Sequence, residues 1–118
     1  MHEREEKLIG DLLEKTRAGL IEWAGYGTPS APHLWQKYQM VLPNGMRLLL
    51  EMNDGVPSRF THLSTFRKDD SLEEVVNTIS AAGNSLFAEV SRRVEKQFLA
   101  PHDEMVEMVI AAVRKIGD

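Results

Sequence analysis

The sequence predicts a small α+β domain in which helices cover one face of an antiparallel sheet. Three observations lead to this fold class: an amphipathic helical pattern over residues 3–18, a β-hairpin pattern over residues 37–52, and a long helical apolar pattern in the second half. Strands followed by helices are typical of α+β proteins. We therefore expect an N-terminal helix, an antiparallel meander of two to three strands, and two C-terminal helices packed on one sheet face, in a single domain of residues 1–118.

The composition is that of a globular protein and narrows the classes of function. The chain has 118 residues, 42% of them hydrophobic and 27% charged, and this length can bury a substantial core. The absence of cysteine excludes disulfides, thiolate zinc sites and cysteine nucleophiles. The net charge of −4 disfavours a general surface for duplex nucleic acid, because such binding depends on phosphate neutralisation. No secretory signal follows Met1 and no apolar run is long enough to span a membrane, so we expect a cytoplasmic protein without a membrane partner.

The first expected helix covers residues 3–18. Its apolar residues recur at three- to four-residue spacing, which places them on one face. They are Leu8, Ile9, Leu12 and Leu13. Gly19 follows the last polar turn and can take the left-handed conformation that ends helices. We expect a short strand or an extended segment over residues 20–23, and then a loop rich in glycine and proline.

The hairpin pattern selects one register. A two-residue Asn44-Gly45 turn would mix apolar and charged residues on both faces, whereas a three-residue loop that includes Pro43 separates them. The three-residue loop pairs Leu42 with Met46, Met40 with Leu48, Tyr38 with Leu50, Gln39 with Leu49, and Lys37 with Glu51. The predicted buried face comprises Tyr38, Met40, Leu42, Met46, Leu48, Leu50 and Met52.

The segment RFTHLSTF, residues 59–66, predicts a third strand. Its β-branched and aromatic content favours this structure. One face of the strand would carry Phe60, His62, Ser64 and Phe66.

The next segment predicts a long helix that begins at Asp70, because Glu73 follows three residues later as in a capping box. Its apolar stripe comprises Leu72, Val76, Ile79, Ala82, Leu86, Val90, Val94 and Phe98. Such a helix would approach ~40 Å in length. Either residues 83–85 bend it, or its exposed end packs on a second chain. Pro101 suits the first turn of a further helix over residues 101–116. One side of that helix carries Met105, Val109, Ala112, Val113 and Ile116.

No arrangement of residues predicts a catalytic site, a cofactor or a metal. The four histidines, at positions 2, 33, 62 and 102, have no metal-ligand spacing. Asp103 and Glu107 could hold a hard cation, but an acidic first turn that complements the helix dipole explains them better. Neither a phosphate-binding glycine motif nor a serine nucleophile elbow is present.

The aromatic loop before the hairpin is the best candidate for partner binding. Its candidate residues are Trp23, Tyr26, His33 and Trp35. Trp and Tyr are enriched at binding hot spots, and functional residues often lie on long loops. The alternative is that Trp23 and Trp35 fold inward and cover the sheet.

Three other groups are weaker candidates. Arg59 and His62 could line a ligand pocket with Trp35 and Tyr38, although a structural histidine is the simpler interpretation. The exposed end of the long helix could form a dimer contact through Leu86, Val90, Val94 and Phe98. A basic group could contact nucleic acid, but a solvated helix face explains it better. This group comprises Arg92, Arg93 and Lys96.

The segment LIGDLLEKTRAGLIEW followed by KYQMVLPNGMRLLLEM resembles the beginning of a loose group of small, uncharacterised bacterial and phage-associated proteins. That group shares an amphipathic helix with an LLEKT…G…W pattern and a strand meander after it. The resemblance covers about the first half of the chain. It implies the helix and the meander, and it carries over no catalytic residue.

These features together predict a non-enzymatic, cytoplasmic protein-interaction module that binds a protein partner and forms a homodimer. One alternative is a small ligand-binding or enzymatic domain with a pocket between sheet and helices. Another is a nucleic-acid-associated regulator, and nucleic acid is the less expected partner.

Overall fold

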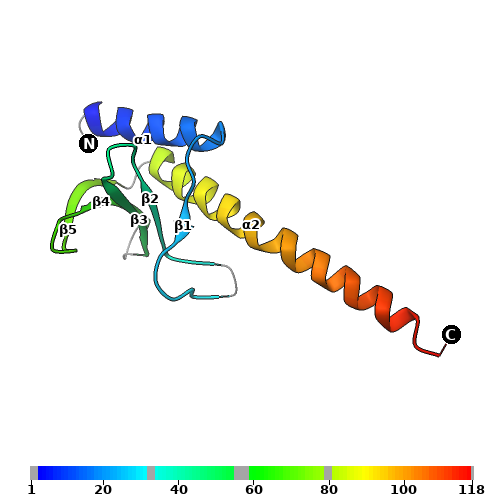
Figure 1. Cartoon of the computed structure of the whole chain (residues 1–118). Coiled ribbons are helices and arrows are strands. Elements are labelled where there is room, and N and C mark those ends of the chain that lie inside the picture. Colours follow the sequence, from blue (N-terminus) through cyan, green and yellow to red (C-terminus); the bar gives the residue numbers. More distant parts are fainter. Residues whose placement is uncertain (1–2, 32–33, 55–58, 79–80, 118) are drawn as a thin grey trace.

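The computed structural model describes residues 3–31, 34–54, 59–78 and 81–117 and confirms the α+β fold class (Figure 1). Its elements are α1 (Glu3–Arg17), β1 (Ala24–Gly25), β2 (Lys37–Val41), β3 (Arg47–Asp54), β4 (Arg59–Phe66), β5 (Leu72–Thr78) and α2 (Ala81–Arg114). The N-terminal helix agrees with its prediction to within one residue. The predicted two to three strands and two C-terminal helices are wrong, because the described chain has a five-stranded sheet and one long C-terminal helix.

The sheet is an antiparallel meander in the order β1-β2-β3-β4-β5. The register predicted for the β2–β3 hairpin is confirmed, with Met40 opposite Leu48 and Tyr38 opposite Leu50. The Leu42 backbone N–H donates to the Met46 carbonyl over 2.7 Å and closes the three-residue loop. Gly45, the last loop residue, has φ of +87°, which a side chain would make unfavourable.

The predicted buried face of this hairpin is largely confirmed. Tyr38, Met40, Leu48 and Leu50 are buried and belong to the core. Leu42 and Met52 are only half-buried. Met46 is exposed, at 45%, because it lies at the end of the hairpin.

Leu49 is also buried, at 1% exposure, although it lies on the opposite face of the sheet. Tyr26 and Phe66 come from segments on either side of β3, and their rings meet with centroids 5.6 Å apart. The strand registers place both side chains on the same face as Leu49. We infer that this aromatic pair covers Leu49, since neither helix lies on that face.

The turn between β4 and β5 repeats the three-residue loop of the first hairpin. The Arg67 N–H donates to the Ser71 carbonyl over 2.8 Å, and the Asp70 N–H donates to the Arg67 carbonyl over 2.9 Å. Asp70 has φ of +65° and takes the place that glycine has in the first loop. Hydrogen bonds from the Ser71 hydroxyl and the Ser71 backbone N–H lower the pKa of the Asp69 carboxyl below its ordinary value.

The prediction that a helix begins at Asp70 is therefore wrong, and residues 72–78 form the edge strand β5. Leu72 and Val76 are four residues apart, a spacing that fits a helical stripe and also one face of a regular strand. In β5 a bulge shifts the register, so that Leu72 lies opposite Phe66 and is exposed, whereas Val76 is on the core face. The pairing with β4 decides between the two, because it buries Val76 opposite Leu63. The β-branched residues of the segment also favour a strand.

One face of the sheet packs against α1 and the first half of α2. The shared core comprises Ile9, Leu12, Trp23, Tyr38, Met40, Leu48, Leu50, Leu63, Val76, Leu86, Val90 and Val94. Both helices cover the same face of the sheet, and the fold is therefore two-layered.

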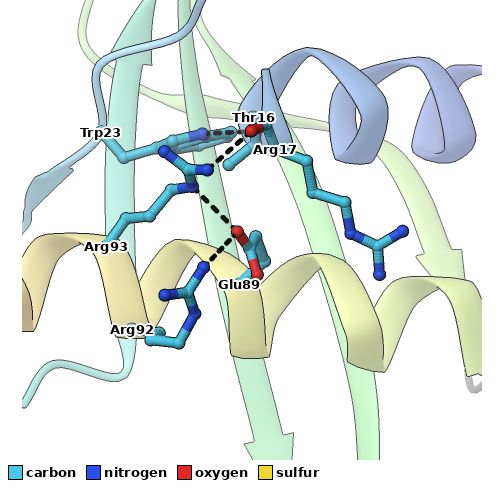
Figure 2. A network of polar contacts seen from close by, with 6 residues as sticks. All are labelled: Thr16, Arg17, Trp23, Glu89, Arg92 and Arg93. Atoms are coloured by element: carbon cyan, nitrogen blue, oxygen red, sulfur yellow. Dashed lines mark hydrogen bonds and ion pairs between the residues drawn. The ribbon is translucent and has the colours of Figure 1, made fainter. Parts of the chain in front are cut away.

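Polar contacts join α1 to α2 beside this core (Figure 2). The buried Trp23 Nε1 donates to Thr16 Oγ1 over 3.0 Å. Arg93 on α2 donates to the carbonyl of Arg17, the last residue of α1, over 2.7 Å. The last carbonyls of a helix lack partners within the helix, so Arg93 satisfies one of them from outside. Glu89 holds the guanidinium in place over 2.9 Å.

The helix α2 is continuous over 34 residues, or about 51 Å. The predicted helix boundary at Pro101 is wrong, because Pro101 lies inside α2. A proline lacks the N–H that would bond to the carbonyl four residues earlier, which weakens a helix without always ending it. Only the first part of α2 reaches the core, so the prediction of helices packed on the sheet holds for that part alone.

We expect Thr16→Val to lower the free energy of unfolding by about 1–3 kcal/mol, since it leaves the buried Trp23 N–H without its acceptor. Chemical denaturation measures this change. Thr28→Val, in an exposed loop, is the matched control and should have little effect. Equal effects of the two substitutions would contradict the role assigned to the Thr16 hydroxyl.

Candidate interaction site

The most unusual surface belongs to the C-terminal part of α2, residues 99–116, which we call the arm. Its helical part is about 24 Å long at 1.5 Å per residue and extends away from the sheet and α1 (Figure 1). Every arm residue except Ile110 is exposed, and Ile110 is half-buried. The arm explains why the radius of gyration is 17.9 Å, where a compact domain of this length would have about 13.5 Å.

The arm is amphipathic although it lies outside the core. Its large exposed apolar residues are Leu99, Met105, Val106, Met108, Val109, Val113 and Ile116. Met108 is 74% exposed and Ile116 is 79% exposed. At 3.6 residues per turn the apolar side chains occupy more than half of the circumference, and the charged residues share the remaining side. The charged residues are Asp103, Glu104, Glu107, Arg114 and Lys115.

The apolar face of the arm continues the face by which α2 packs on the sheet. At 100° per residue, the side of α2 that meets Tyr38 and Trp35 through Phe87, Ser91 and Phe98 runs on into the arm. The arm residues on this side are Met105, Val109, Ala112 and Ile116. Phe87 and Ser91 are half-buried, Phe98 is 44% exposed, and the arm residues are exposed. The arm therefore presents a core-type surface that the described chain does not cover.

An aromatic cluster, comprising Phe87, Tyr38, Trp35 and Phe98, holds α2 at the base of the arm. The Tyr38 ring lies 5.5 Å from that of Phe87 and 6.3 Å from that of Trp35. Trp35 in turn contacts Phe98, with ring centroids 5.4 Å apart. The Tyr38 hydroxyl donates to Ser91 Oγ over 3.0 Å. Tyr38 and Trp35 thus contact α2 at points spread over about three turns and set the direction in which the arm leaves the sheet.

The aromatic residues predicted to bind a partner are mostly turned inward. Trp23 is buried in the core, and Trp35 is half-buried in the aromatic cluster, where its Nε1 donates to the Gly27 carbonyl over 3.2 Å. Tyr26 lies on Phe66 at the opposite face of the sheet. His33 lies outside the described residues.

The residues predicted to line a ligand pocket are not brought together. His62 lies on the face of the sheet that the helices do not cover, where its Nδ1 is 3.0 Å from Glu74 Oε1. Tyr38 and Trp35 belong to the other face, in the aromatic cluster. Arg59 begins β4, but its side chain lies outside the described part of the chain.

The residues predicted for a dimer contact divide into two groups. Leu86, Val90 and Val94 face the sheet and α1 in the core of the same chain. Phe98 is 44% exposed and lies where the arm begins. The apolar residues beyond Phe98 were predicted to form one side of a separate helix. Their number could have indicated a binding surface, because a domain with one small sheet cannot cover all of them.

The predicted basic group has a structural role in part. The guanidinium groups of Arg92 and Arg93 both bind Glu89, at 2.7 Å and 2.9 Å. The hydrogen bond from Arg92 and then that from Arg93 lower the pKa of the Glu89 carboxyl. Lys96 is exposed. Two of the three cations therefore share an anion, and Arg93 also joins α2 to α1, which leaves little charge for phosphate binding.

A groove of about 960 Å³ runs between α1 and β2. Apolar side chains such as Leu8, Leu20 and Leu42 line it, and Asp11, Lys15 and Glu22 add charges. None of the residues predicted for a pocket lines this groove.

Two further findings concern metals and membranes. Among the described residues, no group of three or more metal-ligating side chains could hold a metal ion. Asp103 and Glu107 lie in the middle of α2 and not in a first turn, so their predicted role at a helix start is wrong. No helix in the described ranges combines the length and apolar character needed to cross a membrane.

We expect Gly25→Ala to lower the free energy of unfolding by about 1–3 kcal/mol, because the added Cβ would lie 2.3 Å from Trp35 Cε2 and displace the indole. Chemical denaturation gives this value, and NMR should show shifts at Phe98. Gly10→Ala is the matched control, since its Cβ meets no atom within 4 Å and alanine favours a helix. If both variants were as stable as the native chain, Trp35 would not be held as described.

No protein-family model, curated protein or solved structure gives a significant match to the chain. The resemblance of the first half to small bacterial and phage-associated proteins therefore stays a prediction. What the protein does has to be inferred from its own geometry.

Proposed function

We propose that this chain is a non-enzymatic protein-interaction module that self-associates, with the arm as its binding element. The observation that carries this proposal is the series of exposed apolar side chains on a helix that continues out of the core. Large exposed apolar patches on a protein surface mark sites of interaction. The arrangement of sheet, α1 and aromatic cluster supports this role, because it presents the arm in one direction.

The energetics of the arm support the same role. Most of the stability of helices in proteins comes from packing of an apolar face, and the described chain does not cover this face of the arm. Pro101 near the base of the arm weakens the helix further. Covering most of the exposed apolar side chains of the arm would contribute roughly 5–10 kcal/mol before the costs of association. A partner would therefore stabilise the arm and gain affinity from the same contact.

The two alternative functions have less support. A ligand-binding role would have to use the groove between α1 and β2. Among the described residues that line it, the polar side chains are Asp11, Lys15, Glu22 and Gln39. A nucleic-acid role would rest on Arg92 and Arg93, which Glu89 already engages. Neither alternative accounts for the exposed apolar face of the arm.

We expect Val109→Glu to weaken self-association, because a carboxylate would have to be buried in the apolar contact. Sedimentation velocity over a range of micromolar concentrations measures the effect. We expect the dissociation constant to rise by about tenfold or more.

Ala111→Glu is the matched control, since it adds the same charge two residues away on the charged side of the arm. It should associate like the native chain. A native chain that stays monomeric throughout the concentration series would overturn the self-association part of the proposal.

A further inference from the structure

We propose that the partner of the arm is the arm of a second copy of this chain, and that the two arms pair antiparallel and cross near Val109. This inference rests on the proposed function and adds the occupant, the direction and the register. Three features of the arm carry it: where the body of the protein lies, where the charges lie, and which residues become level with one another.

The position of the rest of the protein, which comprises the sheet, α1 and the first half of α2, excludes a parallel pair of arms. The apolar face of the arm continues the side of α2 that meets Tyr38 and Trp35 through Phe87, Ser91 and Phe98. The sheet therefore lies on the same side of α2 as the surface to be covered. Paired helices lie about 8–10 Å apart. In a parallel pair both sheets would have to occupy the space between the helices at the same level. In an antiparallel pair the sheets lie at opposite ends, and only the arms overlap.

The charges of the arm favour the same direction. Its first half is acidic, with Asp103, Glu104 and Glu107, and its end is basic, with Arg114 and Lys115. A parallel pair would bring acid to acid and base to base. An antiparallel pair places the acidic part of each arm beside the basic end of the other, where opposite charges attract.

The positions of these charges around the helix strengthen the argument. Asp103 and Arg114 are eleven residues apart, which is close to three helical turns, so they lie on the same flank of the arm. Glu104 and Lys115 have the same separation and share the other flank. A two-fold axis perpendicular to an antiparallel pair brings each flank against the same flank of the second copy. Both opposite-charge pairs can therefore form in one register.

That register sets the apolar contacts. If Val109 is level with Val109 of the second copy, level residues have numbers that add up to 218. Asp103 is then within one residue, or about 1.5 Å, of the level of Arg114 of the second copy, and Glu104 is equally close to the level of Lys115. Met105 is then level with Val113 of the other arm. Ile116 is level with His102, one turn beyond Phe98, so the most exposed apolar side chain of each arm covers the base of the other.

Single cysteines test the direction and the register, because the native chain has none. Val109→Cys should form a disulfide-linked dimer under mild oxidation. Met105→Cys and Val113→Cys should cross-link to each other when the two variants are mixed, and much less when each is alone. Ala111→Cys, on the charged side, is the control and should not cross-link. The linked species are resolved by non-reducing electrophoresis and mass spectrometry.

The outcomes separate this inference from the proposed function. If Met105→Cys alone cross-links as well as the mixture does, the arms pair in parallel and the inference is overturned while self-association stands. If the native chain associates but none of the three apolar positions cross-links, association uses another surface, and both the inference and the arm as binding element are overturned. A native chain that stays monomeric overturns self-association and the inference together.

Charge reversal gives a second measurement. Arg114→Glu with Lys115→Glu makes both ends of the arm acidic, and we expect the dissociation constant at low salt to rise by about tenfold. Adding Asp103→Lys and Glu104→Lys to the same chain restores opposite charges in the antiparallel register and should restore the affinity. A fourfold variant that associates no better than the twofold variant would overturn the proposed register.

Discussion

The fold depends most on the contact that Tyr38 makes between the sheet and α2. Tyr38 is fully buried on β2, and its ring contacts Phe87 of α2 on one side and Trp35 on the other. Its hydroxyl bonds to Ser91 of the same helix. One side chain thus links the hairpin, the loop before it and the long helix. Because the arm is a continuation of that helix, the direction of the arm follows from the packing of the sheet, and a candidate binding surface outside the core depends on a residue inside it.

The parts of the fold that could be predicted are those in which one local pattern allowed a single solution. In the β2–β3 hairpin only one register separates the apolar residues from the charged ones, and Gly45 marks the left-handed loop position. The second hairpin has the same loop geometry, but the sequence RKDDS puts Asp70 where LPNGM has glycine. Asp tolerates the left-handed conformation less well than Gly, so the turn signal is weak. The same aspartate followed by Glu73 also matches a helix start, and only the pairing with β4 distinguishes the two.

The candidate site was hidden by a similar ambiguity at Pro101. A proline suits the first turn of a helix and is costly in its interior, so the sequence favours a long helix that ends before Pro101 and a further helix over residues 101–116, both packed on the sheet. A continuous α2 gives the same apolar residues a different role, because Met105, Val109 and Ile116 then lie beyond the reach of the core. The two tryptophans show the reverse outcome, because residues predicted as a candidate binding surface are turned inward. Trp23 and Trp35 were predicted either to bind a partner or to cover the sheet, and the hydrogen bonds of their indole N–H groups to Thr16 and Gly27 favour structural roles.

Apart from the groove between α1 and β2, the surface around the sheet is poorly suited to association. The face of the sheet without helices carries polar contacts between neighbouring strands, such as the Lys37–Glu51 ion pair and the contact between His62 and Glu74. Exposed pairs of this kind contribute little stability, but they keep a sheet face hydrated. The edge strand β5 presents Glu73 and Glu74, and like charges would repel each other if two such edges met. The other edge, β1, has only two residues. Within the described residues, charge and short length thus protect the face and edges of the sheet against association, whereas the arm has apolar side chains where such protection would be expected. This contrast is the strongest physical reason to regard the exposed arm as a binding surface and not as an accident of composition.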